Sequence, residues 1–367
     1  MTGVAPGVGC LDGAVREETS EGSGAVIVVG IDAHKGSHTL VAVNVSGRQL
    51  ACKSVPSTSA GHLQAIRWAS GRFGDDVRWA VEDCRGVTRR LEADLLEAGV
   101  QVVRVPARMM ARTRAAARTV GKSDPIDALA VAQAALRDPT LPVATRDDDS
   151  RAIKLLLDRR ERLIEQRIAT NNRLLWRLHE LDPEFRVSPN ALRHQNHRRT
   201  VNVFLESHQG LIAELGRAEL ADIARLSEEA GHLERRIAVD IRARAPHLLS
   251  IRGCGDLSAA RIVAETAGVH RFSSEAAFAR FAGVAPTPAW SGATEGRVRY
   301  IKTGNRRVNA ALHRIAITQL RDGEGAVYYQ KRREQGDSVM SALRCLKRRI
   351  ARRVYGQMRL DAGLARR

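Results

Sequence analysis

The stretch AVIVVGIDAHKGSHTLVAVNVSGRQLACKSV (25–55) decides the fold, because it predicts three strands in succession. It begins with a continuous apolar run, and two shorter apolar runs follow, separated by turns that contain glycine. Three strands joined by such short turns predict an antiparallel meander at the start of a sheet.

Helices and strands alternate after this meander. The pattern predicts a helix over 59–72 and a buried strand over 77–84 (VRWAVEDC). A helix over 86–99, closed by Gly99, precedes a further strand over 100–106. A three-strand meander followed by alternating helices and strands indicates an α/β sheet. The order fits the ribonuclease-H-like fold in particular, although several mixed sheets would give a similar pattern.

Four carboxylates occupy positions at which such a domain can hold metal. Asp32 ends the first strand, and Glu82 stands on the central strand, with Asp83 directed to the opposite face if the strand continues that far. Asp124 and Asp127, in GKSDPIDALAVAQAAL (121–136), lie three residues apart and share one helix face. Clustered carboxylates repel one another unless a cation compensates them, and hard oxygen ligands suit Mg²⁺, with Mn²⁺ as an alternative. Two such ions about 4 Å apart can clamp the attacking and leaving oxygens of a phosphoryl transfer.

The same residues also have a purely structural interpretation. Asp-Pro-Ile-Asp is a typical helix start, with Asp124 as N-cap, Pro at the first helical position and Asp127 facing the helix dipole. Asp32 alone would pass for a turn residue at a strand end, and Glu82 for a paired surface acid. Both interpretations stay open on each residue alone, and only the joint order of the four acids favours a metal site.

The charge is strongly basic and unevenly distributed. The 367 residues include 59 Lys and Arg against 41 Asp and Glu, a net charge of +18. Residues 1–100 carry 10 basic and 12 acidic side chains, whereas residues 297–367 carry 19 and 5. A basic C-terminal region is typical of a polyanion partner held by counterion release, although an Arg-rich soluble surface would give the same total. Aromatic residues are only 4%, which argues against a broad platform of stacked bases.

The cysteines and the N-terminus indicate a cytoplasmic protein. The five cysteines are odd in number, far apart and without a CxxC pair, so they predict reduced thiols: Cys10, Cys52, Cys84, Cys254 and Cys345. Residues 1–24 are rich in Gly, Ser and acids, and predict a disordered tail rather than a signal peptide. No run of about 18 apolar residues occurs, so no membrane partner is expected.

The sequence pattern changes from alternating strands and helices to long helices after the linker RDPTLPVATRDDD (137–149). Apolar residues recur at helical spacing over 150–181, and a second long pattern runs from about 201 to 244. A Pro-containing break separates the two patterns, which predicts a helical hairpin or coiled-coil arm. The turn Arg252-Gly253-Cys254-Gly255 (252–255) then lies between two helical patterns and resembles a helix-hairpin-helix motif, whose backbone N–H groups can hold a phosphate.

One hydroxyl stands out in GVAPTPAWSGATEGRVRYIKTG (283–304), namely Ser291. A serine attacks phosphate only if its proton is removed and the phosphate charge is offset, and basic groups follow it closely. No histidine is positioned by sequence to act as its base, and a loop serine in a glycine-rich turn is the alternative interpretation. The residues expected to bind nucleic acid are Arg252, Gly253, Gly255, Arg297, Arg299, Lys302, Arg306, Arg307, Lys347, Arg348 and Arg349.

Five motifs together resemble the transposases of the insertion-sequence 110 family. They occur in the family's order between about residues 26 and 358: GIDAHKGSHTLVAV, AVEDCRGVTRRLEADLLEAG, VGKSDPIDALAVAQAAL, FAGVAPTPAWSG and GNRRVNAALHRIAITQLR. Two departures concern the site. Many relatives have Ser-Ser-Gly where this chain has Trp290-Ser291-Gly292, and Asp83 directly follows Glu82, so a register shift of one residue would exchange the second ligand.

The resemblance implies a RuvC-like domain with a DEDD set and a C-terminal transposase domain with a nucleophilic serine. By motif, the acids are Asp32, Glu82, Asp124 and Asp127, and the nucleophile is Ser291. The family implies cutting and rejoining of DNA through a covalent phosphoserine link, guided by a structured non-coding RNA from the element. It further implies a homo-oligomer, a dimer or tetramer, that works at the bacterial nucleoid.

The expected organisation has four parts: a tail (1–24), the RuvC-like domain (25–148), the arm (149–245) and the mainly helical, serine-bearing domain (246–367). Two other functions remain open at this point. One is a RuvC-like nuclease that hydrolyses a DNA junction with water and needs no serine. The other is a non-catalytic nucleic-acid-binding protein left by a decayed element.

Overall fold

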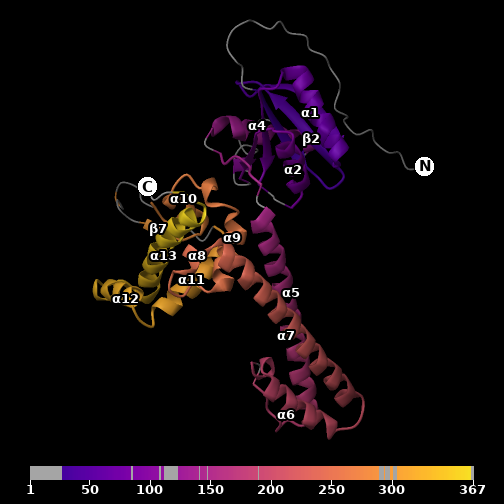
Figure 1. The fold of residues 1–367 in the computed structure, drawn as a ribbon, viewed down its shortest axis with the longest axis vertical. Coiled ribbons are helices and arrows are strands. Elements are labelled where there is room, and N and C mark those ends of the chain that lie inside the picture. The colour runs from indigo at the N-terminus through magenta and orange to yellow at the C-terminus, as the bar shows by residue number, and fades with distance from the viewer. Residues whose placement is uncertain are drawn as a thin grey trace, which may run out of the picture. The chain divides into compact units, whose positions relative to one another are not determined.

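A computed structural model describes residues 27–83, 86–106, 109–110, 123–139, 141–146, 148–188, 190–288, 293, 298–300 and 304–364. The chain divides into two compact units, Met1–Arg146 and Asp147–Arg367, and each is described by itself (Figure 1). The predicted disordered tail, 1–24, lies outside the described residues. In the described part of the chain, no helix is long and apolar enough to cross a membrane.

The first unit is built on a five-stranded mixed sheet of order β3-β2-β1-β4-β5. The first three strands form the predicted antiparallel meander, and β4 and β5 then pair in parallel beside β1. This order confirms the ribonuclease-H-like fold. The strands are β1 (Ile27–Ala33), β2 (Ser37–Val43), β3 (Gln49–Pro56), β4 (Val77–Glu82) and β5 (Val102–Val105).

Helices cover both faces of this sheet, because the strands are apolar on both faces. Helices α1 (Ser59–Phe73) and α2 (Arg89–Glu97) pack on the face that carries Val29, Ile31 and Val81. Helix α4 (Asp124–Arg137) packs on the opposite face (Figure 1). Side chains alternate along a strand, so each strand residue faces either α4 or the α1/α2 pair.

Helix α4 approaches β1 at Gly30, where no side chain separates them. A Cβ atom at Gly30 would lie 2.2 Å from the carbonyl oxygen of Ala128 and 2.4 Å from the backbone nitrogen of Ala132. Both distances are far below van der Waals contact, so only glycine allows this packing. Small residues on the facing side of α4 complete the contact, and Ala128 and Ala132 are fully buried.

A buried chain of polar side chains crosses the other face. His38 of β2 contacts His62 of α1, with their Nε2 atoms 3.1 Å apart and their rings stacked. His62 Nδ1 lies 2.5 Å from Asp94 Oδ2 on α2. Burial and the neighbouring His62 lower the pKa of His38 from 6.5 to about 4. Between pH 6.5 and about pH 4, His38 therefore stays neutral in the folded protein, while the same residue is protonated in the unfolded chain.

The second unit begins with two long helices, α5 (Asp148–Leu181) and α7 (Leu211–Arg244), which pack side by side and antiparallel (Figure 1). This pair forms the predicted arm. The prediction of one continuous helix from about 201 to 244 is wrong. The chain forms two helices there, because α6 (Gln195–Glu206) ends before α7 begins at Leu211. Gly210 has φ of +94°, a left-handed conformation that breaks the helix between them.

The rest of the second unit is a helical bundle with a two-stranded hairpin. Its core includes Phe278, Leu312, Ile315, Leu346 and Val354. The predicted glycine turn is present between α8 and α9, and the predicted nucleic-acid-binding residues Lys347, Arg348 and Arg349 lie within α13. The elements are α8 (Pro246–Leu249), α9 (Asp256–Thr266), η2 (Val269–Arg271), α10 (Glu275–Phe281), β6 (Pro286–Pro288), β7 (Val298–Tyr300), α11 (Arg306–Gln319), α12 (Glu324–Glu334) and α13 (Val339–Asp361). Cys52, Cys254 and Cys345 are free thiols, as expected.

Replacing Gly30 by alanine should destabilise the first unit, because the added methyl group forces α4 away from β1. We expect Gly30→Ala to lower the free energy of unfolding by about 1–3 kcal/mol, the usual cost of overpacking. Gly71→Ala is the matched control, because a Cβ there meets nothing within 4 Å. That control should be neutral or stabilising by up to about 1 kcal/mol. Urea unfolding measures both, and equal effects of the two changes would contradict the close contact.

The His38 network predicts a loss of stability in acid. A group whose pKa is lowered by folding stabilises the protein above its unfolded pKa, and this contribution falls as the pH drops from 6.5 toward about 4. The effect of His38 should therefore lower the free energy of unfolding by about 2 kcal/mol as the pH falls from about 7 to about 5. His38→Gln should shrink this loss in urea unfolding, while the exposed His194→Gln should not. A wild-type loss that persists in His38→Gln would exclude His38 as its source.

Candidate metal centre and nucleic-acid interface

The contact at Gly30 also positions the acidic residues. Asp32 lies two residues after Gly30 on β1 and therefore faces α4. Asp124 lies one helical turn before Ala128, on the stripe of α4 that packs over Gly30. Strand alternation and helix periodicity together place Asp32 beneath the first turn of α4.

Electrostatics at Asp32 shows that three of the predicted acids converge. Burial raises the pKa of the Asp32 carboxyl above its ordinary value, while the charge and hydrogen bond of His34 oppose the rise. The negative charges of Asp127 and Asp124 add to the rise. Neighbouring carboxylates whose charges raise the pKa of Asp32 create a site that favours a cation.

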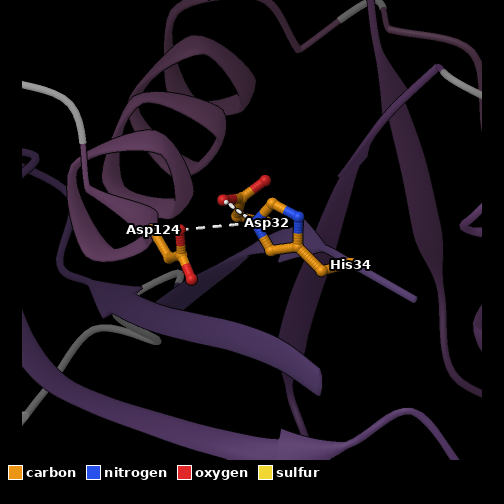
Figure 2. A group of neighbouring side chains, drawn as sticks. All are labelled: Asp32, His34 and Asp124. Carbon is orange, nitrogen blue, oxygen red and sulfur yellow. Dashed lines mark hydrogen bonds and ion pairs between the residues drawn. The ribbon is translucent and has the colours of Figure 1, made fainter. Parts of the chain in front are cut away.

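His34 stands between two of these carboxylates (Figure 2). Its Nε2 atom lies 3.0 Å from Asp32 Oδ2 and 3.4 Å from Asp124 Oδ1. Sequence reasoning did not single out His34. The signal that could have found it was its spacing of two residues from Asp32, which directs both side chains to one face of an extended chain. The ligand atoms of Asp32, His34 and Asp124 all lie within 4.8 Å of one another, close enough to share one metal ion.

The structure also decides the capping question raised by Asp124. The N-cap of α4 is Ser123, and Asp124 is the first helical residue. The backbone N–H of Asp127 donates to Ser123 O at 3.1 Å. The interpretation of Asp124 as the N-cap is therefore wrong by one residue. Its carboxylate points to His34 instead, while still benefiting from the positive end of the helix dipole.

The register of β4 distinguishes Glu82 from Asp83. Ile31 of β1 pairs with Val81 of β4, and both are buried against α1 and α2. Alternation then places Glu82 on the α4 face, beside Asp32 on the neighbouring strand. The N–H of Asp83 donates to Val105 O at 2.9 Å, so the ladder continues and Asp83 faces the other way. Continued alternation would place Asp83 on the α1/α2 face, and the choice of Glu82 as the second ligand stays a prediction.

The donor set fits a hard divalent cation. Asp32 and Asp124 offer carboxylate oxygens and His34 offers an imidazole nitrogen within reach of one ion. Asp127 is near enough for its charge to act on Asp32, and strand alternation places Glu82 on the same face. Carboxylates suit Mg²⁺ and Mn²⁺, and an added imidazole shifts the preference toward transition metals such as Mn²⁺. A bound cation would relieve the mutual repulsion that raises the pKa of Asp32.

The serine segment lies largely outside the described residues. Ser291, Arg297 and Lys302 are among the residues not described. Their described neighbours form the β6–β7 hairpin, in which Thr287 pairs with Arg299 and Pro288 with Val298. The two flanks of the segment are therefore held together as antiparallel strands, and the role of Ser291 stays a prediction.

Where the structure describes their side chains, most of the predicted nucleic-acid-binding cations in the second unit have internal partners. Arg252 forms an ion pair with Asp322, Arg348 with Glu275, and Arg349 stacks on Tyr328 with 5.0 Å to the ring centroid. Arg307 forms ion pairs with three carboxylates: Asp158, Glu161 and Glu265. Lys347 Nζ donates to Asn309 Oδ1 at 2.6 Å. These contacts orient the cations and hold the helices together, so the net charge overstates what is free to bind phosphate.

The glycine turn has backbone conformations that suit its sequence. Gly253 has φ of +81°, and a Cβ there would lie 2.9 Å from Thr318 Cβ on α11. Glycine is required here for both conformation and close approach. Gly255 is the N-cap of α9, which directs that helix's first N–H groups toward the turn.

Known proteins match both halves of the chain. A family model described as "Transposase", for the DEDD domain of IS110 elements, matches residues 29–183. A second, described as "Transposase IS116/IS110/IS902 family", matches residues 245–330. The insertion element IS116 uncharacterized 44.8 kDa protein of Streptomyces clavuligerus is 28% identical over 381 residues, covering 91% of this chain and 94% of that protein. The insertion element IS900 uncharacterized 42 kDa protein of Mycobacterium paratuberculosis is 27% identical over 379 residues, covering 90% and 95%.

One solved structure with some likeness is T. thermophilus RuvC in complex with a Holliday junction substrate. It covers 32% of this chain and 99% of its own, at 18% identity and a TM-score of 0.25. With a score that low, the assignment of the fold rests on the strand order of the sheet and not on this neighbour.

The register of β4 predicts opposite outcomes for two adjacent acids. Glu82→Gln should weaken Mn²⁺ binding about tenfold or more, because it removes a charged oxygen donor from the α4 face. Asp83→Asn removes the same charge from the α1/α2 face and should leave the affinity nearly unchanged. Titration of the full-length protein with Mn²⁺, followed by the loss of the free-ion electron paramagnetic resonance signal, measures both. The reverse order would show that Asp83 is the ligand.

Proposed function

Because the chain belongs to the IS110 family of transposases, we propose that it cuts and rejoins DNA with Ser291 as nucleophile and a phosphoserine–DNA intermediate. The observation that carries this proposal is the convergence of Asp32, Asp124 and Asp127 at one edge of a ribonuclease-H-like sheet. Membership of a transposase family makes DNA the substrate. The acidic cluster supports the proposal, because clustered carboxylates can hold the metal ions that assist phosphoryl transfer.

In this proposal the acids of the first unit hold one or two divalent ions, Mg²⁺ or Mn²⁺. Asp32 and Asp127 are the inner donors, since both carboxylates are largely buried, while Asp124 and His34 stand at the exposed rim. When bound, the metal offsets the negative charge of the phosphate and favours departure of the leaving oxygen. Glu82 completes the set from the neighbouring strand.

The serine step needs only one bond exchanged for another. The Ser291 oxygen forms a bond to phosphorus while the phosphodiester bond to the leaving strand breaks. The serine proton passes to a base, and the leaving strand departs with a hydroxyl group. A hydroxyl of the strand to be joined later attacks the phosphoserine and releases Ser291. Because bond energy is kept in the intermediate, cutting and rejoining need no external energy source.

The proposal includes further partners that the family resemblance implies. A structured non-coding RNA from the element directs the choice of DNA, and the basic side chains of the second unit hold both nucleic acids. The protein acts as a dimer or tetramer at the bacterial nucleoid. The four-part division at 24, 148 and 245 belongs to the same proposal. RNA that co-purifies with the protein, and DNA cutting that is lost after treatment with ribonuclease, would support the guide.

Ser291→Ala should abolish a covalent protein–DNA adduct, because no other oxygen replaces the nucleophile. Thr294→Ala, which removes a nearby hydroxyl, should leave the adduct intact. The full-length protein is incubated with end-labelled element DNA, its non-coding RNA and Mg²⁺, then denatured and resolved on a gel. Asp32→Asn should also remove the adduct, by loss of metal.

The same experiment separates the proposal from its rivals. If the protein is a nuclease that uses water, its Ser291→Ala variant would still cut DNA without forming any adduct. Its Asp32→Asn variant would be inactive. A decayed binding protein would show binding but no cutting with any metal. An adduct that survives Ser291→Ala would overturn the assignment of the nucleophile.

A further inference from the structure

A basic cleft lies at the base of the serine segment in the second unit. The cleft has a volume of about 570 Å³ and lies between α11 and α13. Its wall includes Gly283 and Val284, which lead into β6, and Gly304 and Asn305, which follow β7. The chain therefore leaves for the serine segment and returns from it through the same wall.

Tight backbone contacts fix this wall. The N–H of Asn305 donates to Phe281 O at 2.6 Å. Gly304 has φ of +124°, and a Cβ there would lie 2.7 Å from the nitrogen of Gly283. Only glycine permits this approach, so the two ends of the serine segment are held in direct contact.

The lining of the cleft is positively charged. Among its described lining residues are Arg306, Arg344, Lys347 and His313, and none is a carboxylate. Two other clefts of this unit each include an acid, Glu324 in one and Glu275 in the other. Those two clefts also contain arginines, so what distinguishes the cleft at the serine segment is that no described carboxylate lines it to compete with an anion.

The basic groups of this cleft disfavour one another's positive charge. Burial and the nearby Arg344 lower the pKa of Lys347. Burial, Lys347 and Arg314 lower the pKa of His313. An anion placed among them would replace repulsion with attraction, so the protein carries an electrostatic cost that a ligand can remove.

Asn309 holds Lys347 in position for such a ligand. Its Nδ2 donates to the carbonyl oxygens of Ala282 and Gly283 at 2.9 and 3.1 Å, while its Oδ1 accepts from Lys347. The ammonium group of a lysine has three N–H donors, so this one bond orients Lys347 without using all of them. The cation is thereby tied to the backbone that leads into the serine segment.

Two apolar residues of α13 line the cleft on the same helix as Arg344 and Lys347. Leu343 is buried, and Met340 is 55% exposed beside it on α13. Cations with an exposed thioether beside them on α13 suit a sugar-phosphate chain better than a free inorganic anion, because the sugar has apolar carbon surface to bury.

We propose that this cleft binds a backbone phosphodiester of the DNA strand that Ser291 attacks. The inference rests on the proposed function for the identity of the strand, but binding itself requires neither the serine nor metal. The cleft would hold the strand next to the segment that carries the nucleophile, which is the positioning that phosphoryl transfer needs.

The test measures DNA affinity in a chemically inactive background. In full-length Ser291→Ala protein, Lys347→Gln and Arg344→Gln should each weaken binding of a labelled duplex of about 20 base pairs by about three- to tenfold in fluorescence anisotropy. The slope of log affinity against log salt should fall by about 0.9 for each phosphate that the variant no longer neutralises. Arg321→Gln removes the same charge from an exposed site outside the cleft lining and should change affinity much less.

Two features keep the outcome decisive. If Lys347 and Arg344 share one phosphate, the double variant should weaken binding by less than the two single variants combined. Circular dichroism on each variant shows whether it is folded, and Arg344→Gln tests the cleft without breaking the bond to Asn309. Equal weakening by Arg321→Gln would reduce the cleft to general charge and overturn the proposal.

Competitors identify the occupant. Polyglutamate and an unlabelled duplex are each used to displace the labelled DNA from the wild-type protein. If polyglutamate is as effective as the duplex, the occupant is an acidic protein segment and the proposal is overturned. The proposal would also be overturned if Lys347→Gln and Arg344→Gln lowered the affinity for RNA but not the affinity for DNA. Failure of the serine assignment would appear differently, as an adduct or cutting in Ser291→Ala protein with its DNA affinity still dependent on Lys347.

Discussion

The contact between Gly30 and helix α4 is the constraint on which the first unit depends. The missing side chain lets the backbone of α4 lie directly against β1, with Ala128 and Ala132 in contact. The strand then carries Asp32 two residues further along the same face, and the helix carries Asp124 one turn earlier. One steric requirement in the sheet therefore determines how close the carboxylates come. The energetic consequence is visible at Asp32, whose pKa is raised by burial and by the acids that this packing brings near.

The sheet could be predicted because its signals are local. Apolar runs and turns determine the meander, and alternation alone places Glu82 and Asp83 on opposite faces. The prediction failed where a single residue or a distant neighbour decides. Ser123 rather than Asp124 caps α4, a shift of one residue that composition does not reveal. His34 acquires its role only when α4 brings Asp124 within 3.4 Å of it. The break at Gly210 was hidden because the amphipathic pattern continues across it.

The basic C-terminal region illustrates how formal charge differs from the charge that can bind phosphate. Arg307 and Arg348 are bound to carboxylates of other helices, so they serve the packing of the second unit. Glu265 is held ionised in the same way: burial would raise its pKa, but Asn305 and Lys154 outweigh burial and lower it. Because Asn305 also caps α11, this network stabilises the point where the chain returns from the serine segment. Positive charge collects instead in the cleft beside that point, whose described lining holds cations and no carboxylate.

The two units divide the requirements of phosphoryl transfer between them. Among the described residues, the group of side chains able to share a metal ion lies in the first unit, at Asp32, His34 and Asp124. In the second unit, acids near the serine segment are already neutralised, Glu265 by Lys154 and Asp158 by Arg307. A cation there would have to displace protein partners, which costs more than entering a cluster of mutually repelling carboxylates. We therefore expect metal at the acids of the first unit, and the proposed phosphate contact at the cations of the cleft in the second.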